Sequence, residues 1–222
     1  VALTVIAFIL IGSSSTRAET DSIDELEKKL AVAEGKDKIP IVNRLAFIYC
    51  FRSTEKALEY GNTALKLAEE HNVPKEKAAA LRNIGITYDV SGQYDKAAEF
   101  ATRSYDVYEK MGDKKGMAST LNNIGIAYRN KDDHTKALEY YGRAMAIEKE
   151  LNNKVGIARS LTNTGMVHYD LDNYGEALSN HRQALAIYKE LGKTNSIGNC
   201  YGNIGIVYYH MGDYDKALEY LL

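Results

Sequence analysis

One asparagine recurs every forty residues along the chain. Its four copies are Asn83, Asn123, Asn163 and Asn203. A primary amide carries two donors and an acceptor, so one side chain can pair with both the N–H and the C=O of a neighbouring peptide group. A row of such amides could hold an extended polypeptide at regular intervals. The same amides could instead bond to a neighbouring helix or turn and fix the stacking of the repeats, and the pattern favours the two roles about equally.

The asparagines share their side of the predicted helices with other polar residues. Further candidates for contact with a partner are Arg129, Asn130, Arg159 and Asp170. The remaining positions of this side are mostly small or apolar, as at Ala79, Ile86 and Met166. We therefore predict a surface of low charge on which these few residues supply the polar contacts.

The histidines do not form a metal-binding pattern. They are His71, His134, His168, His181 and His210. His134 and His168 stand where other copies of the repeat have Tyr, and His181 stands where they have Ala or Tyr, which indicates packing roles. The chain also lacks an HExxH motif and a CxxC pair. We expect neither a metal ion nor a cofactor.

Motifs for nucleophilic catalysis and phosphate binding are also missing. Gly192, Lys193 and Thr194 resemble the end of a phosphate-binding loop, but Ile187 replaces the glycine that should precede them by five residues. Cys50 and Cys200 lie in distant repeats and are expected to be buried or half-buried thiols rather than a bridge. We expect these 222 residues not to be an enzyme, an expectation that does not extend to a longer gene product.

Charge and composition narrow the class of partner. The chain carries 28 Lys and Arg against 30 Asp and Glu, so its net charge is −2. A nucleic-acid-binding protein needs a basic face that displaces counterions, so nucleic acid is not an expected partner. Two prolines in 222 residues suit a helical chain.

A repeat of forty residues organises most of the sequence. Residues 81–98 and 201–218 are identical at ten of eighteen positions. Within each copy, Leu81, Ile84, Gly85 and Tyr88 have the spacing of one helical stripe, and a second stripe begins at Ala97. A glycine inside a helix costs about 1 kcal/mol relative to alanine, so Gly85 is expected where the second helix approaches closely with the small Ala97. Each copy is thus two helices joined by a turn.

These residues resemble the tetratricopeptide repeat. The family pattern of a large apolar residue, a Leu-Gly pair, a Tyr and an Ala is matched by Leu81, Ile84-Gly85, Tyr88 and Ala97. The period is forty rather than thirty-four, as in a subclass that includes cell-polarity adaptors, kinesin light chains and bacterial peptide-sensing regulators. The resemblance implies an all-α, right-handed superhelical solenoid whose concave groove carries the asparagines. A carboxylate-clamp co-chaperone would have an Asn four residues after the basic residue, but the residue four positions after Arg82 is Ile86. This difference disfavours a co-chaperone of that kind.

The repeats give a domain organisation. Residues 20–36 are predicted to form a capping helix, and residues 37–222 the repeat array. The predicted repeats are 37–74, which is divergent, then 75–113, 114–153, 154–193 and a truncated 194–222.

The first residues differ from the rest. Residues 1–18 begin with an uncharged, mainly apolar run of twelve residues followed by small polar ones, typical of a signal peptide whose charged leader is missing. Twelve residues are too few to span a bilayer comfortably. We expect an exported protein, with a buried N-terminal helix and a cytoplasmic location as the alternative. Membrane contact is expected only through this segment or through a span beyond residue 222.

Two functions remain open from the sequence. The resemblance implies an exported scaffold that binds a protein or peptide as an extended segment in the groove. The alternative is the extracytoplasmic sensor region of a larger bacterial signalling protein, with a histidine kinase or nucleotide cyclase beyond residue 222. The following stretch of the gene would discriminate between them.

Overall fold

The computed structural model describes residues 22–222, and its regular structure there is helical throughout. The helices are α1 (Ile23–Val32), the 3-10 turn η1 (Gly35–Asp37), α2 (Lys38–Tyr49), α3 (Thr54–Glu70), α4 (Pro74–Val90), α5 (Tyr94–Lys110), α6 (Lys114–Asn130), α7 (His134–Glu150), α8 (Lys154–Asp170), α9 (Tyr174–Glu190), α10 (Thr194–His210) and α11 (Tyr214–Leu221). The predicted all-α repeat solenoid is confirmed. The predicted signal peptide, 1–18, lies outside the described residues. None of the described helices is long and apolar enough to cross a membrane.

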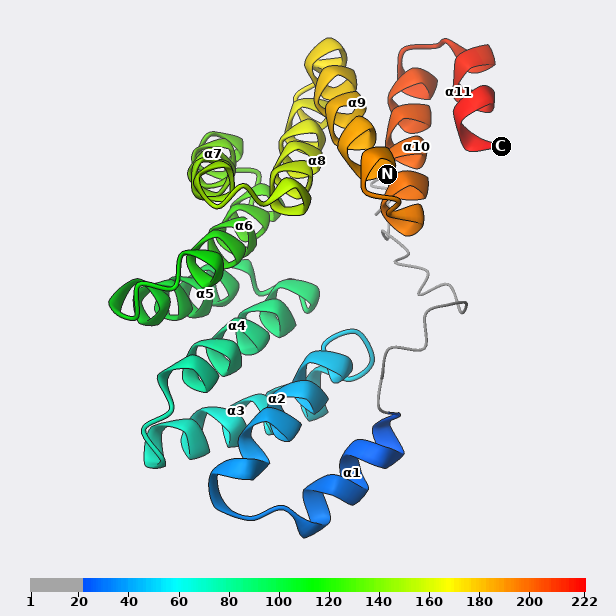
Figure 1. Ribbon diagram of the computed structural model, residues 1–222. Coiled ribbons are helices and arrows are strands. Elements are labelled where there is room, and N and C mark those ends of the chain that lie inside the picture. Colours follow the sequence, from blue (N-terminus) through cyan, green and yellow to red (C-terminus); the bar gives the residue numbers. More distant parts are fainter. Residues whose placement is uncertain (1–21) are drawn as a thin grey trace.

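The helices pair in sequence order and stack along a curve. Each helix packs on the one before it and the one after it, from α2 to α11 (Figure 1). The first helices of successive pairs, α2, α4, α6, α8 and α10, also contact one another. Among residues 22–222 the second helices of successive pairs make no such contact. The stack therefore bends toward the first helices, which lie on the inside of the curve, while α1 covers the end of the stack by packing on α2.

Local chemistry sets the helix boundaries. Ser22 and Glu25 form a reciprocal capping box at the start of α1, and Pro74 occupies the first turn of α4, where its missing N–H is not needed. Asp133 caps α7 by accepting a hydrogen bond from the Lys136 N–H at 3.2 Å. The turn that ends α4 needs the left-handed region, and Gly92 supplies it with φ of 78°.

The mid-helix glycines make room for the second helix of their own pair. A Cβ on Gly85 would lie 3.3 Å from the carbonyl oxygen of Ala97, which confirms the predicted close approach. On Gly125 a Cβ would lie 2.5 Å from the ring of Tyr141. Gly165 similarly accommodates His181, so the residue that fills the space changes from pair to pair.

The first pair has a different register from the others. Tyr49 precedes the start of α3 at Thr54 by five residues, whereas Tyr88 precedes the start of α5 at Tyr94 by six. The buried stripe of α2 is therefore shifted by one residue. Asn43 consequently lies on α2 at the position that Arg82 occupies on α4, although the forty-residue repeat aligns Asn43 with Asn83.

The core is divided among neighbouring helices. Its largest cluster joins α8, α9, α10 and α11, and smaller clusters join the earlier pairs. Cys50 and Cys200 are both buried and free, as expected from the sequence. Each pair buries its apolar surface only against its neighbours, which is the property of a solenoid.

Candidate functional site

The inner face is the candidate site. We define it as the sides of α2, α4, α6, α8 and α10 that turn away from their own second helices, on the inside of the curve. On α4 it includes Lys75, Ala79, Arg82, Ile86 and Val90, which share one side at helical spacing. Residues at the same positions of the other first helices continue the face along the stack.

The amide of Asn83 is used inside the fold. Its side chain is buried, and its Nδ2 donates to the backbone carbonyl of Asn43 at 2.9 Å. The Asn43 amide in turn donates to the Glu76 carboxylate at 2.7 Å. Asn83 therefore joins α4 to α2, and the stacking role applies to this copy of the asparagine.

Asn163 is also bonded to the preceding repeat. Its Nδ2 donates to Oδ1 of Asn122 at 3.1 Å, and the Ser160 hydroxyl donates to the same oxygen at 3.4 Å. The Asn122 amide itself donates to the carbonyl of Ala118 at 3.1 Å. Sequence reasoning did not single out Asn122. The available signal was the Asn122-Asn123 doublet, which no other repeat contains.

Asn123 and Asn203 differ from the other two copies. Both side chains are half-buried on the inner face, and neither makes a side-chain hydrogen bond to any residue within 22–222. The row of asparagines thus contains two amides that join repeats and two that keep their donors and acceptor available.

Arg129 and Asp170 form a bidentate ion pair across α6 and α8. Arg129 Nε lies 2.5 Å from Asp170 Oδ2, and Nη2 lies 3.2 Å from Oδ1. The two side chains are only 22% and 24% exposed. Two parallel hydrogen bonds in such a site fix both side chains. These two predicted site residues are therefore paired with each other within the fold.

Asn130 extends this polar contact to α4. Its Nδ2 donates to Asp89 Oδ1 at 2.9 Å. Burial raises the pKa of the Asp89 carboxyl, whereas the hydrogen bond from Asn130 and the charge of Arg129 act to lower it. Asp89 was not among the sequence candidates. Together these side chains connect α4, α6 and α8 along one edge of the inner face.

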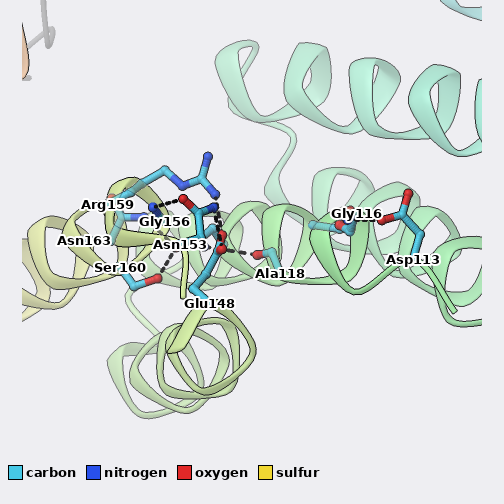
Figure 2. A network of polar contacts seen from close by, with 11 residues as sticks. Asp113, Gly116, Ala118, Glu148, Asn153, Gly156, Arg159, Ser160 and Asn163 are labelled. Atoms are coloured by element: carbon cyan, nitrogen blue, oxygen red, sulfur yellow. Dashed lines mark hydrogen bonds and ion pairs between the residues drawn. The ribbon is translucent and has the colours of Figure 1, made fainter. Parts of the chain in front are cut away.

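Arg159 reaches a buried carboxylate. Glu148, on α7, is 1% exposed, and it accepts from Arg159 Nη2 at 3.2 Å and from Asn153 Nδ2 at 2.7 Å (Figure 2). Gly156 provides the space, because a Cβ there would lie 2.1 Å from the Glu148 carboxyl carbon. Sequence reasoning missed Glu148. Its signal was a carboxylate at a position where the flanking repeats have Tyr108 and Tyr188.

Burial shifts the pKa of several other titratable groups within residues 22–222. Within residues 22–222 no group of three His, Cys, Asp or Glu side chains is placed to hold a metal ion. Burial lowers the pKa of His181 to about 4. Burial also raises the pKa of the Cys50 and Cys200 thiols, which is the opposite of what an activated nucleophile needs.

The repeats match a known family. The tetratricopeptide repeat family profile matches residues 39–110, 116–190 and 165–222. The chain therefore belongs to the tetratricopeptide repeat family. No curated protein sequence matches it.

Solved structures share the fold at low sequence identity. BtubC from P. vanneervenii is 22% identical, with a TM-score of 0.71 over 90% of this chain and 84% of that one. A Rap protein in complex with Competence and Sporulation Factor is 21% identical, with a TM-score of 0.75 over 89% and 56%. NprR in complex with its cognate peptide NprX is 17% identical, with a TM-score of 0.71 over 89% and 58%. The chain thus spans little more than half of the last two proteins.

Proposed function

We propose that the chain is a scaffold that binds a protein or peptide as an extended segment on its inner face. The observation that carries this proposal is the state of Asn123 and Asn203, whose half-buried amides have no hydrogen-bond partner within residues 22–222. Neither amide is fully enclosed by the fold, so a partner's peptide groups would find these donors and acceptors available. The low charge of the later part of the face suits a polypeptide backbone.

Two of the solved structures that share the fold support a peptide as the ligand. Two of the similar structures, Rap and NprR, contain a bound factor or peptide. Their identity to this chain is low, so they support the class of ligand and give no information on its sequence.

The binding role of the free amides can be tested by mutation. A peptide array probed with the purified chain supplies a binding peptide, whose Kd is then measured by fluorescence anisotropy. The double substitution Asn123→Ala and Asn203→Ala removes hydrogen bonds worth about 0.5–1.5 kcal/mol each, so the Kd is expected to rise about tenfold. The melting temperature is expected to change little, because neither amide has a bond within the fold to lose.

A matched control separates this effect from the loss of any asparagine. Asn62 lies exposed on α3, a second helix, and Asn62→Ala is expected to leave the Kd unchanged. An unchanged Kd for the Asn123 and Asn203 double variant would overturn the proposed role of these amides.

We also propose that the protein is exported. The apolar run followed by small polar residues in 1–18 supports this proposal. Expression of the gene with its full leader is expected to give a mature protein that begins near Glu19, as determined by N-terminal sequencing. Recovery of the intact N-terminus from the cytosol would contradict export, and its recovery from membranes would indicate an anchor.

The second candidate function is the sensor region of a larger signalling protein. One similar structure is a signal transduction ATPase with a tetratricopeptide repeat sensor, of which this chain spans 31%. The gene sequence after Leu222 tests this candidate. An apolar span followed by a kinase or cyclase domain would support it, and a stop codon after one capping helix would support the simple scaffold.

A further inference from the structure

The inner face changes character along the stack. In its later part, on α6 and α8, the polar side chains are bonded within the fold: Arg129 to Asp170, and Arg159 to Glu148. The earlier part, contributed by α2, α4 and the start of α6, instead combines exposed apolar side chains with cations that have no acidic partner. A ligand gains the most binding free energy where the polar and charged groups of the protein are not already paired with one another.

The apolar side chains come from α2 and α4. Phe47 and Phe51 are 37% and 53% exposed, and their rings meet edge to face with centroids 6.2 Å apart. The register shift of α2 places Phe47 on its inner side, at the position that Ile86 occupies on α4. Phe51 lies in the turn directly after α2 and corresponds to Val90 at the end of α4. Val90 is 49% exposed. These residues form an apolar surface next to a half-buried Ile86.

The charge of this part comes from Arg82. Its side chain is half-buried, and within residues 22–222 it forms no hydrogen bond, ion pair or ring contact. Glu76, an acidic residue on the same helix, is engaged by the Asn43 amide at 2.7 Å. Of the three inner-face arginines on α4, α6 and α8, Arg82 is therefore the one whose guanidinium has no carboxylate.

Repeat symmetry identifies the neighbour of Arg82. In the next pair of first helices, Asn163 of α8 bonds to Asn122 of α6. The equivalent residues one repeat earlier are Asn123 and Arg82, on α6 and α4, whose helices contact each other. The repeat symmetry therefore predicts an unpaired guanidinium beside an unpaired amide, and both can donate to one carboxylate.

Other cations surround this pair. Arg44, Lys75 and Lys115 are exposed on the inner sides of α2, α4 and α6, and no ion pair within residues 22–222 includes them. The acidic residue on this side of α4, Asp89, accepts the hydrogen bond of Asn130. Asp89 and Glu76 keep their charges, because the amides bonded to them are neutral, but the four cations outnumber these two carboxylates. The earlier part of the inner face is therefore positive, although the whole chain has a net charge of −2. An acidic partner would be attracted to it.

We propose that the partner segment is acidic and apolar, and that it binds to the inner face of α2, α4 and the start of α6. Phe47, Phe51 and Val90 receive its large apolar side chains. Arg82, with Asn123 beside it, binds a side-chain carboxylate of Asp or Glu. This inference rests on the proposed peptide-binding function and specifies where on the inner face the partner binds and what it carries.

Three sets of fluorescent, C-terminally amidated peptides test the chemistry. One set combines Leu and Phe with Asp and Glu, the second combines Leu and Phe with Lys and Arg, and the third combines Ser and Gly with Asp and Glu. Amidation leaves side chains as the only carboxylates. Anisotropy with the purified chain is expected to show binding of the first set, at least tenfold tighter than the other two, and weaker at high salt.

Variants of the chain locate the site. Arg82→Gln is expected to raise the Kd of the first set about tenfold or more, because it removes a charged hydrogen bond, and Arg82→Lys is expected to restore part of the affinity. Phe51→Ser is expected to weaken binding by a similar factor. The matched control Arg103→Gln changes net charge equally on the second helix α5 and is expected to have no effect. Circular dichroism verifies that each variant is folded.

The outcomes distinguish this inference from the proposed function. Equal binding of the basic set, or unchanged affinity of Arg82→Gln and Phe51→Ser, overturns the inference. If the Asn123 and Asn203 double variant still loses affinity in that case, the peptide-binding function stands without it. Absence of binding by all three sets overturns the inference of an acidic, apolar partner. A peptide array without any binder overturns the proposed peptide-binding function as well.

Discussion

A single asparagine position has two different roles in this molecule because its partner comes from the preceding repeat. Asn163 finds an acceptor in Asn122, whereas the residues that precede the other two copies are Arg82 for Asn123 and Thr162 for Asn203. The Thr162 hydroxyl already donates to the carbonyl of Ala158 at 3.0 Å. For Asn123, Asn163 and Asn203 the residue that decides the role lies forty-one positions earlier, so the recurrence of asparagine alone could not predict it.

His181 makes the stability of the fold depend on pH. Its ring is buried, and burial, with the positive charge of Arg129, lowers its pKa to about 4 from an ordinary 6.5. The unfolded chain takes up a proton below pH 6.5, and the folded chain does not until pH 4. The free energy of unfolding is therefore expected to fall as the pH drops from about 6.5 toward 4, by about 2 kcal/mol at pH 5.

Chemical denaturation at pH 7 and pH 5 measures this loss. His181→Leu is expected to remove most of it, since Leu221 fills the corresponding space over Gly205. The exposed His71 is the control, and His71→Gln is expected to keep the full loss. An equal loss in the His181→Leu protein would show that other groups cause the acid sensitivity.

At the scale of the element, each pair of helices from α4 and α5 onward is defined by the contact of its mid-helix glycine. Gly125→Ala places a methyl group 2.5 Å from the ring of Tyr141, which is fully buried and cannot move aside. Overpacking of this kind costs about 1–3 kcal/mol. Thermal melting of the variant is expected to show that loss.

Gly142 provides the matched control. It lies on the exposed side of α7, and a Cβ there would meet nothing within 4 Å. Gly142→Ala is expected to stabilise the protein by about 0.5–1 kcal/mol, because alanine favours the helix without a steric cost. A gain in stability for both variants would mean that the Gly125 contact is not tight.

Sequence periodicity predicted most of the elements but less of the site. The stripe from Leu81 to Tyr88 and the turn glycines were sufficient for the helix pairs, because those signals are local. The register of α2 was harder to predict, since the stretch between Tyr49 and α3 is one residue shorter than the corresponding stretch in the other pairs. Glu148 was missed because its partner Arg159 is brought to it by packing. The apolar inner side of α2 was missed because the register of this helix was not recognised from the sequence.

At the scale of the whole molecule, stability is the sum of contacts between neighbouring pairs. Exposed ion pairs such as Lys114 with Glu150 and Lys154 with Glu190 repeat along the stack, but exposed pairs contribute little, at most about 1 kcal/mol each. Apolar contact between adjacent helices carries most of the stability. No described helix contacts one more than two positions away in the stack.

This arrangement predicts that the stack can be shortened from its C-terminal end. Removal of residues 194–222 deletes α10 and α11 and exposes apolar side chains of α9 such as Leu185 and Tyr188. The melting temperature is therefore expected to fall, while circular dichroism still shows the helices of residues 22–193 and a cooperative transition. The acidic, apolar peptides are expected to keep most of their affinity for the shortened chain, because Phe51 and Arg82 lie at the other end and only the hydrogen bond of Asn203, worth about 0.5–1.5 kcal/mol, is lost. Loss of all helical signal would mean that the stack folds only as a whole. Complete loss of peptide binding by a folded fragment would place most of the partner's contacts on α10 rather than at Phe51 and Arg82.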